Sequence, residues 1–110
     1  TMPNKSLRIL IADSDTEQAL KIDRALNLAG YHRVAPLRAV DALKGLRDAK
    51  PGEFDLLLIS QKMAGGPAVD AAQYHRDNAQ FRHIRIYQDA DALAANIVEL
   101  MQSIDPPQRP

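Results

Sequence analysis

The sequence predicts an α/β fold: a parallel sheet with helices on both of its faces, in three layers. Short apolar runs typical of buried strands alternate along the chain with segments whose apolar residues recur at helical spacing. One run, residues 54–59, is apolar almost throughout, as a strand covered on both faces requires. Strand and helix alternate four times, which favours right-handed crossovers between parallel strands.

The predicted elements follow one another without long gaps. Strands are expected over residues 7–12, 31–36, 54–59 and 81–88, and helices over 14–29, 40–47, 68–78 and 89–104. Ser14 and Glu17 have the spacing of a capping box, Gly30 can close the first helix, and Asp89 can cap the last one. Polar side chains after parallel strands gather at one edge of the sheet, which directs attention to Asp13, Ser14, Ser60 and Gln88.

The length of 110 residues fits a single domain. Residues 1–104 are expected to form this domain, and the proline-rich residues 105–110 a linker or tail. No internal repeat divides the chain. The sequence therefore predicts one core and one function.

The composition excludes several classes of protein. Lys plus Arg and Asp plus Glu both number 14, so no overall charge attracts DNA. The chain has no Cys, and its three histidines lack the spacing of metal ligands. No stretch is apolar enough to cross a bilayer, and no export signal is evident. We expect a cytoplasmic protein without a membrane or DNA partner.

Several segments resemble the receiver domain of response regulators. The run Leu-Arg-Ile-Leu-Ile-Ala-Asp-Ser-Asp at residues 7–15 is similar to the opening of that family, as is Ala-Gly-Tyr at 29–31. Residues 55–65 resemble its third strand and the following loop, and residues 93–100 its last helix. The resemblance covers nearly the whole chain in order, and it implies the flavodoxin-like receiver topology.

The resemblance fails at the residues that carry the family's chemistry. Ser60 stands where the family has its phosphoacceptor aspartate, and Ser14 replaces the second acid of the pair that begins with Asp13. A hard cation such as Mg²⁺ needs several oxygen ligands, commonly carboxylates, so this residual acidic pocket should bind it poorly. An acyl phosphate also needs a carboxylate, and Ser60 has no evident general base. We expect no phosphorylation, no metal, no cofactor and no enzymatic activity.

The resemblance also indicates a deletion. A complete receiver has one more helix and one more strand than the segment between Met63 and Asp89 can hold. The sheet should therefore have four strands in the order 2-1-3-4, with residues 81–88 at an edge. The hydroxyl and lysine that end the family's last strands have no clear counterpart, although Tyr87 and Gln88 lie near one of these positions.

In the edge strand, Ile84 and Ile86 should point to one face and His83, Arg85 and Tyr87 to the other, which should be wet. One interpretation is that His83 and Arg85 only shield the edge. Another is a recognition surface, because arginine and tyrosine bind phosphate, stack on bases and anchor interfaces. The candidate surface residues are Arg76, Arg82, His83, Arg85, Tyr87 and Gln88.

The sequence thus leaves two functions open. The first is a phosphorylation-independent pseudo-receiver that docks onto a histidine kinase or a neighbouring domain of its parent protein, such as a hybrid kinase. The alternative is a receiver-like sensor of a nucleotide second messenger such as cyclic di-GMP.

Overall fold

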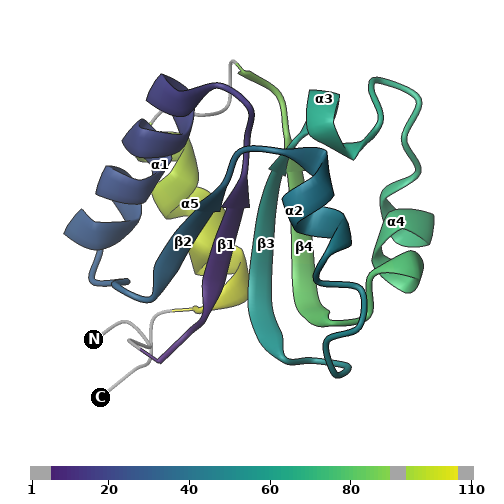
Figure 1. Ribbon diagram of the computed structural model, residues 1–110. Coiled ribbons are helices and arrows are strands. Elements are labelled where there is room, and N and C mark those ends of the chain that lie inside the picture. The colour runs from purple at the N-terminus through teal and green to yellow at the C-terminus, as the bar shows by residue number, and fades with distance from the viewer. Residues whose placement is uncertain (1–5, 90–93, 107–110) are drawn as a thin grey trace.

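The computed structural model describes residues 6–89 and 94–106, which form one parallel sheet with helices on both faces (Figure 1). The strands are β1 (Ile9–Ala12), β2 (Val34–Leu37), β3 (Phe54–Ser60) and β4 (Phe81–Tyr87). The helices are α1 (Thr16–Leu28), α2 (Val40–Lys44), α3 (Gln61–Ala64), α4 (Ala71–Asp77) and α5 (Ala94–Ile104). The strand order is β2-β1-β3-β4, and every pairing is parallel. The predicted fold class, strand order and edge position of the last strand are confirmed.

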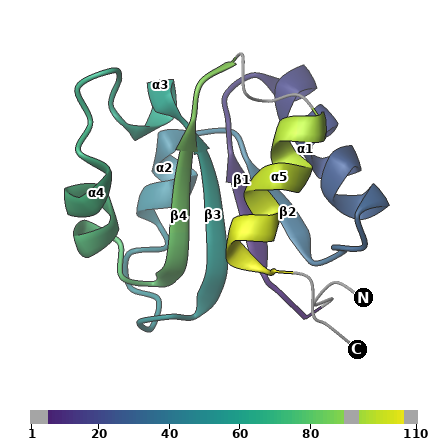
Figure 2. The ribbon, with the colours of Figure 1, turned by 180° about the vertical axis from the view of Figure 1, so that it is seen from behind.

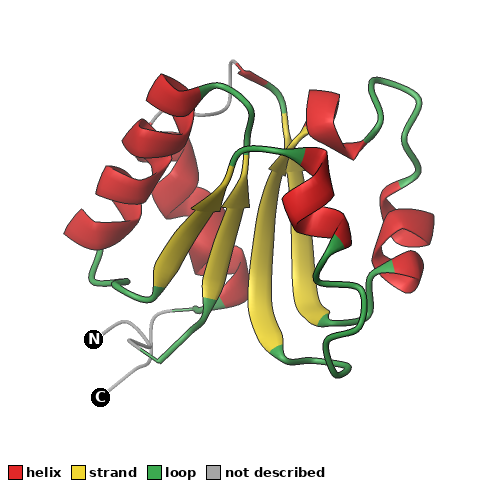
Figure 3. Ribbon diagram, viewed as in Figure 1, coloured by secondary structure: helices red, strands yellow, loops and turns green. Residues whose placement is uncertain are grey.

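The two faces of the sheet are covered by different helices. Figure 1 shows α2 in front of the sheet, α3 at the upper end of β3 and β4, and α4 beside β4, and Figure 2 shows α5 on the opposite face, toward α1. The secondary-structure colouring makes the three layers visible together (Figure 3). In Figure 2, α5 lies toward β1, and no helix of the described chain lies over the middle of β4 on that side. No helix of the described chain is long and apolar enough to cross a membrane.

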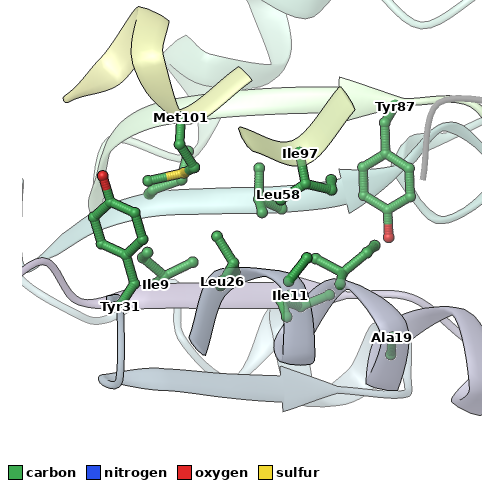
Figure 4. Close-up of a cluster of buried hydrophobic side chains, with 12 residues drawn as sticks. Ile9, Ile11, Ala19, Leu26, Tyr31, Leu58, Tyr87, Ile97 and Met101 are labelled. Carbon is green, nitrogen blue, oxygen red and sulfur yellow. The ribbon is translucent and has the colours of Figure 1, made fainter. Parts of the chain in front are cut away.

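The core on the α1 and α5 face consists of buried, mostly apolar side chains. Alternate residues of β1 and β3 point into it, and α1 and α5 close it from outside (Figure 4). Its fully buried members include Ile11, Leu26, Leu58 and Ile97. Truncating such a residue to Ala costs about 2–5 kcal/mol, so this layer fixes α1 and α5 against the sheet.

The core on the other face uses the alternate residues of the same strands. Leu57 and Ile59 of β3 are fully buried and pack in a cluster with Leu43 and Phe81. The rings of Phe54 and Phe81 lie 5.5 Å apart between centroids. Because both faces of β3 are buried, its nearly continuous apolar sequence is explained.

The first helix begins one residue later than the capping box predicted. The Asp13 carboxylate accepts a hydrogen bond from the Asp15 amide (2.9 Å), and Asp15 in turn accepts one from the Gln18 amide (3.1 Å). Asp15 is therefore the N-cap, and the prediction of Ser14 with Glu17 was wrong. The turn made by Asp13 leaves Ser14 exposed.

Three other predicted boundaries differ from the structure. The second strand is Val34–Leu37 rather than residues 31–36, because Tyr31 is buried in the core and bonded through its hydroxyl to Asp105 (2.6 Å). The second helix ends at Lys44, followed by turns. The helix expected over 68–78 is the shorter α4, and α3 was missed. Residues 90–93 and 107–110 lie outside the described residues, as do the predicted start of the last helix after Asp89 and most of the tail.

Candidate functional site

The carboxyl ends of β1, β3 and β4 bring three polar side chains together. Asp13 follows β1, Ser60 ends β3, and Tyr87 ends β4 beside Ser60 in the parallel register. All three are only 3% exposed. Buried polar groups need hydrogen-bond partners, so their contacts determine what this edge of the sheet can do.

Asp13 is the centre of a buried hydrogen-bond network. The Tyr87 hydroxyl donates to its Oδ2 atom at 2.7 Å, and the Gln18 side-chain amide donates to the same oxygen at 2.6 Å. The Asp15 backbone amide donates to Oδ1 at 2.9 Å. Gln18 also donates to Asp89 (3.1 Å). Three donors from two elements and one turn thus hold the carboxylate in place.

Tyr87 is held as a neutral donor. Burial, the hydrogen bond to Asp13 and the negative charges of Asp13, Asp89 and Asp15 all raise the pKa of Tyr87 far above its ordinary value. Its ring packs in the core beneath α5 (Figure 4). The prediction that Tyr87 lies on a wet face was wrong. The residue does point to the same face as His83 and Arg85, but at its end of the strand α1 and α5 cover that face.

Ser60, at the position where the receiver family has its phosphoacceptor, is the N-cap of α3. Its hydroxyl oxygen accepts a hydrogen bond from the Met63 amide at 3.2 Å and so caps α3. Among the described residues, no histidine, lysine or carboxylate forms a hydrogen bond with Ser60. Within the described part of the chain, the hydroxyl therefore has no hydrogen-bonded base that could activate it as a nucleophile.

The Mg²⁺ that the resemblance implies does not fit this donor set. Asp13 is occupied by three protein donors, Ser14 is exposed, and Ser60 serves as a helix cap. No group of three or more His, Cys, Asp or Glu side chains in the described chain could hold a metal ion. The charges and the coordination that a hard cation requires are absent from these residues.

A second candidate surface lies along β4 and α4. A groove of about 530 Å³ is lined by apolar residues, Phe81 and Ile84 among them, and by the basic side chains of Arg76 and Arg85. Within residues 6–89 and 94–106, these arginines and Arg82 form no ion pair. Ile84 packs in the cluster on the α2 side, and Arg85 is aligned with Leu58, which points to the α1 and α5 side, so the backbone positions of both residues agree with the predicted faces.

The electrostatics of this surface are positive. Desolvation, followed by the charges of Arg85, His75 and Arg82, lowers the pKa of His83, and Asp55 acts in the opposite direction. His83 is therefore mostly neutral at pH 7. The predicted residue Gln88 lies elsewhere, in a polar concavity of about 310 Å³ that Lys62 also lines.

The comparisons with known proteins agree with this topology. Over 101 residues the chain is 26% identical to chemotaxis protein CheY-3 from each of two strains of Vibrio cholerae serotype O1. The match covers 91% of this chain and 76% of the relative. No protein-family model and no solved structure matches the chain. The fold and this similarity support a receiver-like domain of two-component signalling.

Sequence reasoning singled out Asp13, Ser14, Ser60 and Tyr87, but it did not connect Tyr87 with Asp13 and did not name Gln18. Gln18 was overlooked because it lies inside a predicted helix, one turn after its cap. The signal for Tyr87 was available: in a parallel sheet with order 2-1-3-4, the ends of β1, β3 and β4 meet at one edge.

Proposed function

We propose that this receiver-like domain is a phosphorylation-independent pseudo-receiver that regulates its parent protein by docking. The observation that carries the proposal is the network around Asp13. In it, the hydroxyl of Tyr87 and the amide of Gln18 both donate to the carboxylate oxygen that a metal ion would need as a ligand. The partner class is a histidine kinase or a neighbouring domain.

Three physical arguments support the proposal that the domain is not phosphorylated. Ser60 carries a hydroxyl and no carboxylate, so it cannot form an acyl phosphate, and its oxygen is engaged as a cap. The Asp13 network is buried and fully hydrogen-bonded, so opening it would leave polar groups unsatisfied. Ser14 cannot supply the missing charge.

Intact-mass measurement after incubation with acetyl phosphate and Mg²⁺ tests the proposal. We expect no gain of a phosphoryl group in the natural chain or in Ser60→Asp, because Asp13 and Ser14 are unchanged in that variant. A stable phosphoryl adduct on the natural chain that is lost in Ser60→Ala would contradict the proposal. An adduct that persists in Ser60→Ala would indicate another phosphoacceptor and would equally contradict the proposal that the domain is not phosphorylated.

The second candidate, a sensor of cyclic di-GMP, is weakened by the burial of Tyr87, which removes the proposed stacking ring. Arg76 and Arg85 still border the groove and could hold phosphate. Calorimetry with cyclic di-GMP separates the two functions, because a docking module should show no heat of binding.

A further inference from the structure

β4 forms an open edge of the sheet. It pairs with β3 and with no other strand of the described chain. On β3, the Leu56 amide bonds to Arg8 on the β1 side (3.2 Å), so the backbone groups of Leu57 face β4. In a parallel pair only one member of each aligned pair directs its groups toward the other. Leu57 is aligned with Ile84, so the amide and carbonyl of Ile84, and those of Ile86 two residues on, point outward.

Two side chains lie against carbonyls of β4 that point away from β3. The Phe81 carbonyl is one of them, because the Phe54 amide donates to the Gln80 carbonyl (2.9 Å) and the groups of the aligned Phe81 therefore point outward. A guanidinium nitrogen of Arg85 donates to the Ile84 carbonyl at 3.1 Å. The His75 ring lies 2.9 Å from the Phe81 carbonyl, at the opposite end of β4. Arg85 therefore stands where the amide of a neighbouring strand would be. Its charge has no carboxylate partner in the described chain.

The two faces of the edge differ in chemistry. On the α4 side, Ile84 and the small side chains Ala71 and Ala72 line the apolar part of the groove. On the opposite face, His83 is partly exposed, and Figure 2 shows no helix over the middle of β4. The Arg85 side chain, also partly exposed, extends to the outward Ile84 carbonyl and lines the groove as well. A strand laid beside β4 would place every second side chain in the apolar groove and the others next to positive charge.

We propose that the β4 edge accepts an extended segment of a partner protein in which acidic and apolar residues alternate, as a fifth strand of the sheet. An amide of this segment replaces Arg85 at the Ile84 carbonyl, and the released guanidinium binds an acidic side chain of the same segment. Main-chain hydrogen bonds then supply affinity, and the two faces supply specificity. The inference rests on the proposed docking function and names the surface and the kind of partner.

A second copy of the chain is a poorer occupant. Two β4 edges placed side by side would bring Arg82 and Arg85 of one copy close to the same arginines of the other, and like charges near one another are destabilising. An acidic segment instead meets the positive charge of these two arginines. Charge complementarity therefore selects the heterologous partner.

Amide hydrogen exchange, measured residue by residue on the whole chain, tests the proposal. The probe is a short blocked peptide in which glutamate and valine alternate, and the control peptide has lysine in place of glutamate. At saturating probe we expect the exchange of Ile84 and Ile86 amides to slow at least about tenfold. The His83 and Arg85 amides, which already face β3, should not change. The lysine peptide should have no effect.

Two pairs of variants sharpen the test. Arg85→Glu should weaken binding of the probe at least about tenfold, whereas Arg24→Glu, a matched change on the exposed face of α1, should not. Ile86→Pro removes an outward amide without affecting the ladder to β3, and Ile86→Ala is its control because both variants lose the same side chain. If Ile86→Pro does not fold, the arginine pair still decides.

Several results would overturn the proposal. These are no protection of Ile84 and Ile86, protection by the lysine peptide as well, protection in a peptide-free dimer, or binding of cyclic di-GMP at Arg85 without amide protection. Each is distinguishable from failure of the proposed function, which the phosphoryl mass reports independently of the β4 amides.

Discussion

Removing the Tyr87 hydroxyl should destabilise the domain by about 1.5–3 kcal/mol, the usual cost of losing a hydrogen bond to a charged group. In Tyr87→Phe the ring keeps its place in the core, so no cavity adds to this cost. The buried Asp13 retains Gln18 and the Asp15 amide but loses its 2.7 Å bond to the hydroxyl. Urea unfolding followed by circular dichroism measures the change. With a slope of about 1–3 kcal/mol per molar urea, the midpoint should fall by roughly 1 M.

Tyr31→Phe is the matched control. Its hydroxyl also donates to an aspartate, Asp105 at 2.6 Å, but Asp105 is partly exposed and water can replace the lost bond. We expect a smaller loss of about 0.5–1.5 kcal/mol. If Tyr87→Phe proved no more costly than Tyr31→Phe, Asp13 would not depend on Tyr87, and the argument that the site is committed to structure would fail. Stabilisation of the natural chain by millimolar Mg²⁺ would refute it as well.

Three further predictions follow from the same contacts. All three tyrosines have a pKa raised above the ordinary 10.0, so the phenolate absorbance of the folded chain should appear at a higher pH than that of the unfolded chain. Because the unfolded chain releases these protons first, stability should be intact below about pH 10 and fall as pH rises above it. Ser60→Ala should cost about 1 kcal/mol through the lost cap, and the exposed Ser14→Ala no more than about 0.5, as measured by urea unfolding. Without a partner, the amides of Ile84 and Ile86 should exchange faster than those of His83 and Arg85, and equal rates would reject the assigned edge.

The fold could be predicted because its signals are local and repeated. A nearly continuous apolar strand such as residues 54–59 requires cover on both faces, and only a few topologies provide it. The features that the sequence failed to predict are short. α3 has four residues and depends on the Ser60 cap, which no periodic pattern reveals in so short a helix. The cap of α1 moved from Ser14 to Asp15 because Asp13 forms a turn, a contact that competes with the capping box.

The site was harder to predict because burial depends on which helix lies over a strand. Alternation placed Arg85 and Tyr87 on the same face, and this assignment was confirmed. It could not show that α1 and α5 cover one end of that face and leave the other open. The predicted exposure to solvent was therefore correct for His83 and Arg85, which are partly exposed, and wrong for the buried Tyr87.

Asp13 is fully hydrogen-bonded within the protein, and this limits how the proposed module can be regulated. A phosphoryl group or a metal changes the charge of a site, and that change can shift a two-state equilibrium. The Asp13 network instead ties β1, α1 and β4 together through neutral donors that remain protonated at physiological pH. A ligand or a modification could act on Asp13 only by breaking these buried hydrogen bonds. Under the proposed function, regulation therefore enters at a surface, where a partner is bound or released. β4 is the strand that connects the two, because Tyr87 fixes its end while Ile84 and Ile86 leave its outer edge open.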